Sequence, residues 1–457
     1  MKGSFLGRGG HPSYARNMRA VIVALAASSA LSLAPPALAA RDMPCAFYGI
    51  DPGAPVDAGR VILDEERAEQ LARAGAGAVR VEFLLDDAEA WDEDKLDEYE
   101  AIIDAVRGAG LEPLGLLSHR TLAEGQARWN DDPDGDGNNA YVEAFAATAE
   151  ALMTRFAGDV VRWEIWSQPN CFEDPDYALD PENAGCTYIL PRVLAQILAQ
   201  IRIRNEALFN VGELSLIAGG LLASDDAAAP FSGVDYLREL YEQPVLEELA
   251  LRYGERTPWS YLGHQLFVSQ FSEVDPVAFG GTLDEVRELA EQAGDESPFF
   301  VTGMAWSSAL VGEELQAANL TTSLELLSQR DDVAGVVWAS FQDGPGAERL
   351  YGLVDEAGAA KVAFAALRDE AAGCEPEQGG GTGSGGDGSG SSSGGVSGVP
   401  LPGTSGQGGR PIDGKRRESS CSYAAGAPQG RGALPDVGWL ALLAGLAIAI
   451  ARSRRVI

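Results

Sequence analysis

The chain has 457 residues, enough for one large barrel with terminal tails or for about three domains. With 46% hydrophobic and 22% charged residues, its composition is typical of a protein that buries a globular core. Asp and Glu outnumber Lys and Arg by 68 to 34, and the formal net charge of −34 argues against a nucleic-acid partner, because phosphates attract cationic side chains. A solvated acidic surface of this kind suits a protein that works outside the cell.

Residues 1–40 have the features of a signal peptide. A basic region precedes an apolar run at residues 20–33, and Ala37-Leu38-Ala39 has the A-x-A form of a signal-peptidase site. The alternative is an N-terminal membrane anchor, which the shortness of the apolar run and Pro35-Pro36 disfavour. We therefore predict an exported protein.

Between residues 45 and 374, strand and helix signals alternate eight times. The predicted strands are residues 47–51, 78–83, 112–117, 160–167, 214–219, 262–267, 299–304 and 334–341. The intervening helices include residues 64–74, 96–108, 140–156, 190–206, 283–293 and 313–329, with Thr282 and Glu285 as a capping box for the fifth of these. Eight such units predict an α/β fold of the (β/α)8, or TIM-barrel, type, with functional residues at the carboxyl ends of the strands. An open doubly wound sheet is the alternative, but no glycine-rich phosphate loop follows the first strand.

The segment VVRWEIWSQPN at residues 160–170 carries the most specific pattern in the chain. A β-branched pair, alternating side chains and a terminating Pro169 predict a strand. The segment resembles the fourth-strand motif W-E-I-W-N-E-P-N of clan A glycoside hydrolases, in which the Glu of N-E-P is the general acid/base. Ser167 and Gln168 stand at the N-E positions here, and a carboxamide cannot donate and recover a proton near neutral pH as a carboxyl group can.

Other strand ends are similar to the same clan, nearest to its family 39 members, over most of residues 45–372. The seventh predicted strand reads PFFVTGMAW, in which Thr302 and Trp306 match the clan pattern while Gly303 stands at the position of the nucleophilic Glu. Retaining hydrolysis needs two carboxyl groups about 5–5.5 Å apart. With Gln168 and Gly303 at the two catalytic positions, the resemblance implies a barrel that no longer performs this reaction.

Two alternatives remain open: an active hydrolase with relocated carboxylates, and a surface scaffold without a sugar ligand. Glu82 and Asp343 lie near predicted strand ends and are candidates for a relocated pair. Glu164 lies four residues before Gln168, about 13 Å deeper in the barrel, and is expected to be a buried side chain paired with a neighbour such as Arg80.

A carbohydrate ligand or surface glycan is the predicted partner, because aromatic faces stack on sugar rings and cationic or polar side chains hydrogen-bond to hydroxyl groups. Core or rim packing is the alternative for each of these side chains. The candidate binding residues at the strand ends are Arg80, His119, Ser167, His264, Trp306 and Trp338.

Residues 132–143 fit the calcium-loop pattern D-x-[DN]-x-[DN]-G-x5-E. An acidic turn without metal is the alternative. No organic cofactor is expected. The predicted calcium ligands of this structural site are Asp132, Asp134, Asp136, Asn138 and Glu143.

The C-terminal part changes composition. Residues 375–420 are rich in Gly and Ser and predict a flexible linker. In residues 421–457, Cys421 is followed by a short apolar run at 437–451 and by terminal arginines, an order that resembles the MYXO-CTERM sorting tail of myxobacterial surface proteins. That resemblance implies a short C-terminal hydrophobic helix, a sorting protease as partner, membrane association only through the tail, and display at the cell surface or outer membrane. A permanent transmembrane anchor is the alternative.

Five cysteines fit an oxidising compartment. Cys45 and Cys374 bracket the predicted barrel, and Cys171 and Cys186 enclose a short polar loop, which makes these the two expected disulfides and leaves Cys421 odd. Four cysteines allow three connectivities, so the pairing is inferred from position alone.

Overall fold

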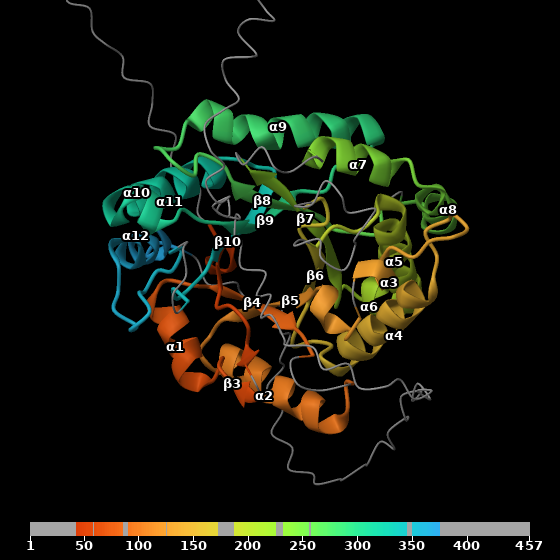
Figure 1. Ribbon diagram of the computed structural model, residues 1–457, viewed down its shortest axis with the longest axis horizontal. Helices are drawn as coiled ribbons and strands as arrows, with labels where there is room; N and C mark the ends of the chain where they lie inside the picture. Colours follow the sequence, from red (N-terminus) through yellow and green to blue (C-terminus); the bar gives the residue numbers. More distant parts are fainter. Residues whose placement is uncertain are drawn as a thin grey trace, which may run out of the picture. The chain divides into compact units, whose positions relative to one another are not determined.

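A closed barrel of eight parallel strands forms the body of the protein. The computed structural model describes residues 43–57, 59–85, 90–124, 126–171, 187–224, 232–255, 257–344 and 350–374. Neighbouring strands in the barrel follow one another along the chain, and the last pairs with the first (Figure 1). The barrel strands are β1 (Tyr48–Asp51), β4 (Ala78–Phe83), β5 (Glu112–Leu117), β6 (Arg162–Ser167), β7 (Ser215–Ser224), β8 (Tyr261–Phe267), β9 (Phe299–Met304) and β10 (Val333–Ala339).

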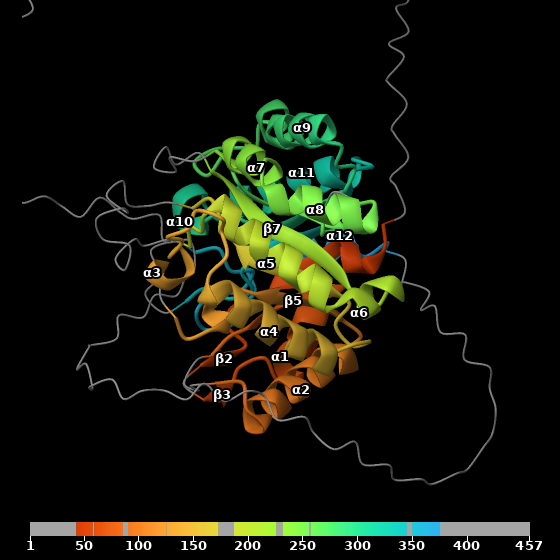
Figure 2. The same cartoon turned by 90° about the vertical axis from the view of Figure 1, so that its right-hand side faces the viewer.

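Helices surround the barrel, and Figure 2 shows α4, α5 and α8 on one side of it. Three of them start at polar caps: the side chains of Asp64, Asp92 and Asn139 each accept a hydrogen bond from the backbone N–H three residues later. The helices are α1 (Glu65–Arg73), α2 (Glu93–Gly108), α3 (Gln126–Trp129), α4 (Ala140–Arg155), α5 (Pro191–Arg204), α6 (Glu206–Asn210), α7 (Gly233–Tyr241), α8 (Pro244–Tyr253), α9 (Pro276–Ala293), α10 (Ser308–Val311), α11 (Glu313–Ser328) and α12 (Val362–Ala371), with short 3-10 turns η1 (Cys45–Phe47) and η2 (His119–Thr121). A small hairpin of β2 (Val56–Asp57) and β3 (Arg60–Val61) follows β1.

The predicted (β/α)8 barrel is confirmed, and every predicted strand overlaps an observed one. The capping box at Thr282 is wrong. Helix α9 starts seven residues earlier, where Asp275 caps it and Pro276 occupies its first turn, and the Thr282 hydroxyl donates to the Phe279 carbonyl inside the helix. In the part of the chain that the structure describes, no helix is both long and apolar enough to cross a membrane.

Inside the barrel, a small apolar cluster lies apart from the main core between strands and helices. It fills the inward faces of β5, β7, β9 and β10 with large side chains, which is how the interior of such barrels is normally closed. Its members are Leu114, Ile217, Phe300 and Val337, with Tyr261 and Ala334 packed against them. The polar side chains of the site therefore rest on a packed floor and not on an open pore.

The predicted disulfide Cys45–Cys374 is present, with a Cα–Cα distance of 4.8 Å. It joins the turn before β1 to the segment just after α12, so it ties together the two ends of the barrel, 329 residues apart in sequence. Such a link removes many conformations from the unfolded chain, more so the longer the loop that it closes.

We expect the double variant Cys45→Ser, Cys374→Ser to lose about 2–4 kcal/mol of unfolding free energy, measured by urea denaturation. Cys421→Ser is the matched control, because it removes a cysteine that lies outside the barrel segment. An unchanged denaturation midpoint in the double variant would show that the link contributes nothing.

Candidate functional site

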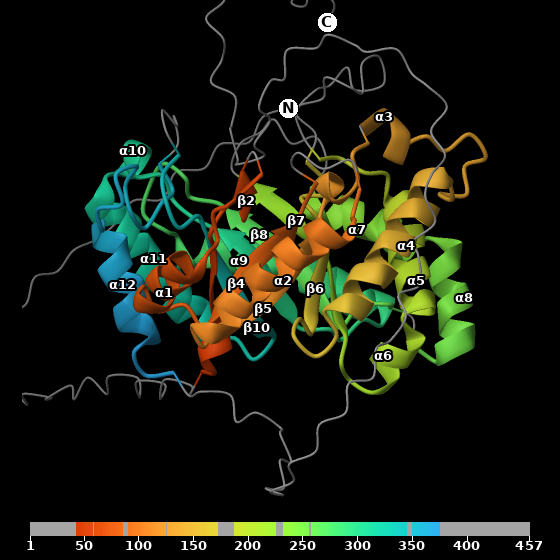
Figure 3. The ribbon, with the colours of Figure 1, turned by 90° about the horizontal axis from the view of Figure 1, so that it is seen from below.

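A cavity of about 430 Å³ opens at the carboxyl ends of the barrel strands. Figure 3 shows β2, α3 and α10, which follow the carboxyl ends of β1, β5 and β9, together at this end of the barrel. This is the end where barrels of this type bind their ligands. The lining residues are Asp51, Pro52, Gly53, Ala54, Arg80, Glu82, Leu116, Ser118, His119, Arg120, Ser167, Gln168, Thr187, Gln265, Phe267, Thr302, Gly303, Ala339, Ser340, Gln342, Asp343, Gly344 and Tyr351.

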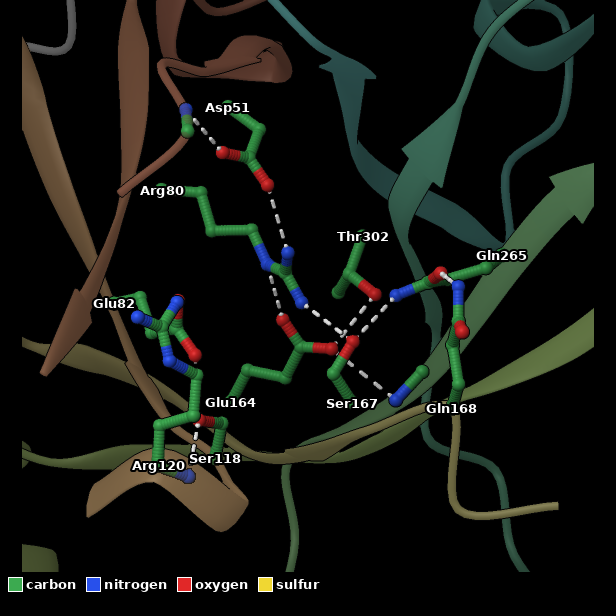
Figure 4. A network of polar contacts seen from close by, with 12 residues as sticks. Asp51, Arg80, Glu82, Ser118, Arg120, Glu164, Ser167, Gln168, Gln265 and Thr302 are labelled. Atoms are coloured by element: carbon green, nitrogen blue, oxygen red, sulfur yellow. Dashed lines mark hydrogen bonds and ion pairs between the residues drawn. The ribbon is translucent and has the colours of Figure 1, made fainter. Parts of the chain in front are cut away.

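Arg80, on β4, joins three strands through its guanidinium group (Figure 4). Its Nε donates to Glu164 Oε2 at 2.7 Å, one terminal nitrogen donates to Asp51 Oδ2 at 2.9 Å, and the other donates to Ser167 Oγ at 3.1 Å. The side chain is buried. Burial opposes its charge, but Glu164 and Asp51 hold the pKa of Arg80 above the ordinary arginine value.

Glu164 is fully buried, and the expected pairing with Arg80 is confirmed. Its second oxygen, Oε1, accepts hydrogen bonds from Thr302 Oγ1 at 2.9 Å and from the Gly220 N–H at 3.2 Å. Burial raises the pKa of this carboxyl group, while Arg80 and the hydrogen bonds oppose that rise. Glu164 is not among the residues that line the cavity, and its hydrogen bond holds Arg80 in place.

Two carboxamides meet where the clan resemblance expects the catalytic carboxyl groups. Gln168 Nε2 donates to Gln265 Oε1 at 2.8 Å, and Gln265 Nε2 donates to Ser167 Oγ at 3.1 Å (Figure 4). A Cβ atom built on Gly303 would lie 3.3 Å from the same Gln265 Oε1 and 3.1 Å from its Cδ. Gln168 and Gly303, which the resemblance marks as the acid/base and nucleophile positions, thus lie on either side of one amide oxygen, and neither carries a carboxyl group.

Two glycines on the neighbouring strands, Gly220 and Gly303, leave space for the Gln265 side chain. A Cβ atom at Gly220 on β7 would lie 2.9 Å from Gln265 Cγ, and one at Gly303 on β9 would lie 3.3 Å from the same atom. Gln265 therefore fills the space into which a side chain at Gly303 would point. Any attempt to restore a nucleophile at that position has to shorten Gln265 as well.

The end of β6 is an irregular strand. Trp166 and Gln168 have left-handed backbone angles, with φ of 73° and 53°, which residues other than glycine adopt at a cost of about 1–3 kcal/mol. The Gln168 N–H bonds to the Gly220 carbonyl, and Thr187 Oγ1 donates to the carbonyls of Ser167 and Gln168, which hold this conformation. Strain of this kind clusters at functional sites.

The irregularity changes which side chains face the cavity. Simple alternation places Trp166 on the same face as Gln168, but Trp166 packs outward against Trp129, Tyr141 and Phe145, and its indole N–H donates to the Thr187 carbonyl. Ser167 and Gln168 consequently both line the cavity.

Three carboxylates line the cavity, and each is engaged. Asp51 accepts from Arg80 and from the Gly53 N–H at 2.8 Å. Glu82 accepts from Ser118 Oγ at 2.6 Å and from Arg120 at 3.3 Å. Asp343 pairs with Lys361 Nζ at 2.6 Å and accepts from the Gly352 N–H at 2.7 Å.

Of the six predicted binding residues, Arg80, His119 and Ser167 line the cavity, and three do not. His264 lies on the outward face of β8, where its ring is 6.2 Å from that of Phe299. Trp306 and Trp338 are buried with their rings 6.1 Å apart, and their indole N–H groups donate to the carbonyls of Ser269 and Tyr351. These three side chains pack the core around the barrel, so the prediction that they face a ligand is wrong.

Both strand-end histidines are held neutral. Burial, with a smaller contribution from Arg120, lowers the pKa of His119 to about 4 against the opposing charge of Glu82. Burial alone lowers the pKa of His264 to about 4. His119 therefore faces the cavity without a charge near neutral pH.

Gln265 was not predicted from the sequence, although it bonds to Ser167 and Gln168 and fills the space beside Gly303. His264, one residue earlier, was predicted as a binding residue instead, because it lies near the end of a predicted strand. The register between β8 and β9 shifts at His264 and Gln265, and this step turns Gln265 toward Gly303. Inward alternation along β8 from Tyr261, an aromatic side chain of the inner cluster, was the available signal.

Two of the predicted calcium ligands, Asp132 and Glu143, form ion pairs with arginine side chains. The Asp132 carboxylate is buried, accepts from the N–H groups of Gly135 and Gly137 at 3.1 Å, and forms an ion pair with Arg192. Glu143 pairs with Arg204 at 2.7 Å. Within the described ranges, no three His, Cys, Asp or Glu side chains are arranged to hold a metal ion. Calcium would have to replace both arginine contacts, so its binding stays a prediction.

If calcium binds, EDTA should lower the melting temperature, because a ligand of the native state stabilises it by about 2.7 kcal/mol at a hundred times its Kd. Asp134→Ala should remove that sensitivity. A melting curve that ignores both calcium and chelator would leave Arg192 and Arg204 as the groups that hold the loop.

The structure describes only one cysteine of the second predicted disulfide, Cys171–Cys186. Cys171 is disulfide-bonded, whereas Cys186 lies outside the described residues. Cys421, the linker at 375–420 and the signal peptide at 1–40 lie outside them as well.

No protein-family model matches this sequence. Similar solved structures include a family 39 glycoside hydrolase from Bacteroides cellulosilyticus, with 16% identity over 72% of this chain and 64% of that one, at a TM-score of 0.48. Another is a family 5, subfamily 18 glycoside hydrolase from Streptomyces cattleya in complex with Manβ1-4GlcNAc, with 15% identity over 71% of this chain and 80% of that one, at a TM-score of 0.49. This chain thus spans less than two thirds of the family 39 protein. The barrel is established by its own strand pairing.

Proposed function

We propose that this protein is a glycoside hydrolase-like barrel that binds carbohydrate without cleaving it. The observation that carries the proposal is the contact between Gln168 and Gln265 beside Gly303, at the two positions where hydrolysis would need carboxyl groups. Amides hydrogen-bond to hydroxyl groups as both donors and acceptors, but they do not transfer protons at neutral pH.

The cavity supports a sugar ligand by its size and its lining. Its volume of about 430 Å³ falls within the range of about 300–1,000 Å³ that is usual for small-molecule sites. Gln168, Ser118 and Arg120 supply polar groups, and Phe267 and Tyr351 supply aromatic surface. The alternative is an active hydrolase that uses Glu82, which lines the cavity with a side chain 19% exposed.

A glycan array tests binding, with calorimetry on the glycans that it retains. Gln168→Ala should weaken binding at least about tenfold, because it removes one neutral hydrogen-bonding group and exposes the partner amide, a loss of about 1.4 kcal/mol. Gln292→Ala, which removes a carboxamide from the exposed face of α9, is the control and should bind as the wild type does. Failure of the wild type to bind any glycan would favour a scaffold without a sugar ligand.

We further propose that the protein is exported and displayed at the cell surface through residues 421–457. The support is the sequence pattern of Cys421, an apolar run and terminal arginines. Cys421→Ala should leave the chain unprocessed or misplaced, as seen by surface labelling and by the mass of the mature chain, while the barrel melts as before. Unchanged surface display of the Cys421→Ala variant would contradict the role of this tail.

A further inference from the structure

Each charged side chain that lines the cavity contacts a group of opposite charge, and Arg80 is shared between Asp51 and the buried Glu164. Asp51 lies 2.9 Å from Arg80, and Glu82 lies 3.3 Å from Arg120. The third carboxylate, Asp343, lies 2.6 Å from Lys361, which is buried directly behind it. Within the described lining, each carboxylate therefore has a cation in contact, and both lining arginines have a carboxylate in contact.

Uncharged side chains of the cavity lining supply the donors and acceptors that are still open to a ligand. The Gln168 carboxamide donates one of its two N–H bonds to Gln265, and among the described residues its second N–H and its oxygen are left for a ligand. Ser118 Oγ already donates to Glu82 and accepts from the Arg120 N–H, so its contribution is limited. His119 adds an uncharged ring, since burial lowers its pKa to about 4.

We infer that the cavity selects an uncharged sugar and discriminates against both acidic and basic sugars, because its own charges are already paired and its Gln168 carboxamide is the free recognition group. This inference rests on the proposed function and specifies its ligand class. An added carboxylate or ammonium group in the cavity would lose water without gaining a counter-ion, unless it broke one of the existing pairs.

The test uses sugars that differ only in charge. Matched methyl glycosides of a neutral hexose, the corresponding hexuronate and the corresponding hexosamine are titrated calorimetrically, in the gluco, galacto and manno configurations. In the configuration that binds, we expect the neutral member to bind at least about tenfold more tightly than either charged member. Its Kd should change little between low and high salt, because salt screens interactions between net charges.

Two variants should shift the preference toward one charged member by unpairing one charge. Glu82→Gln keeps an acceptor for Ser118 but leaves Arg120 without its carboxylate, and should improve hexuronate binding about tenfold in a salt-dependent way. Arg120→Gln leaves Glu82 alone and should favour the hexosamine instead. Glu314→Gln is the control, because it makes the same change in net charge at an exposed position of α11, and it should change no preference.

The outcomes separate this inference from the function on which it rests. A charged member that binds the wild type best, with strong salt dependence, would overturn the selection for neutral sugars while leaving sugar binding intact. Failure of all three triplets and of the glycan array would overturn both. The melting curve of each variant checks that it is folded. Because Glu82→Gln is expected to favour the hexuronate and Arg120→Gln the hexosamine, either variant alone can test the inference if the other is unstable.

Discussion

Purified wild-type protein is expected to release no detectable product from activated aryl glycosides. A positioned general acid or base alone contributes about 10²–10⁴-fold to such reactions, and a retaining hydrolase also needs its nucleophile. Gln168 supplies neither proton transfer nor charge, and Gly303 has no side chain. The measurement is release of nitrophenol from a panel of aryl glycosides over days, with protein from two independent purifications.

A rebuilt site should gain weak activity with retention of configuration. Gln168→Glu and Gly303→Glu restore the two carboxyl groups, and Ser167→Asn completes the N-E-P triplet. The structure adds a fourth change, Gln265→Ala, because a Cβ atom at Gly303 already lies 3.1 Å from Gln265 Cδ. The backbone at Gly303 is not in the left-handed region, so a side chain there is compatible with its conformation.

The comparison among variants is informative because the two carboxyl groups act as a unit. Each single variant should stay inactive, and the triple variant that keeps Gln265 should turn over less than the quadruple variant. Clear turnover by the wild type that is lost in Glu82→Gln would show that the carboxylates have moved. Asp343 is the weaker candidate for that role, because its carboxylate is already held by Lys361 and by the Gly352 N–H.

Local sequence patterns were sufficient to predict the barrel. Apolar strands bounded by turn residues repeat eight times, and a parallel strand that returns through a helix places consecutive strands side by side. The contact of Glu164 with Arg80 followed from the depth of Glu164 in the strand and from its need for a counter-ion. The pairing of Cys45 with Cys374 followed from their positions at the two ends of the barrel segment.

Local patterns failed where a strand departs from regular alternation. The left-handed backbone at Trp166 turns its own side chain outward and brings Ser167 to the cavity beside Gln168, and no property of a tryptophan side chain signals such a backbone angle. On β8, by contrast, regular alternation from Tyr261 places Gln265, and not His264, on the inward face, and only the pairing of Gln265 with Gly303 depends on the register shift between β8 and β9. Helix α9 was predicted too short because two glycines, Gly280 and Gly281, interrupt its pattern, although Asp275 and Pro276 make a sound start.

The largest stability effect is expected at the base of the same site, on replacing Arg80. Arg80→Leu leaves Glu164 fully buried with only Thr302 and the Gly220 N–H as partners, and removal of one member of a buried pair costs about 3–5 kcal/mol. Glu164→Leu should cost less, because Arg80 keeps Asp51, which is partly exposed to solvent. The double variant Arg80→Leu, Glu164→Leu should recover part of the loss, since neither charge is then left alone.

The pH dependence distinguishes an unpaired charge from lost packing. Burial raises the pKa of Glu164 even beside Arg80, and without Arg80 the folded-state pKa should rise further above its unfolded value. A group with a raised folded pKa contributes stability below its unfolded pKa that is lost as the pH rises through the folded pKa. The loss of unfolding free energy in Arg80→Leu, measured by urea denaturation, should therefore be larger at pH 7.5 than at pH 5.

The control is Arg155→Leu, which breaks exposed ion pairs with Asp97 and Glu100 and should cost at most about 1 kcal/mol at either pH. An Arg80→Leu deficit that is as small as this control, or that does not change with pH, would show that Glu164 does not need its arginine.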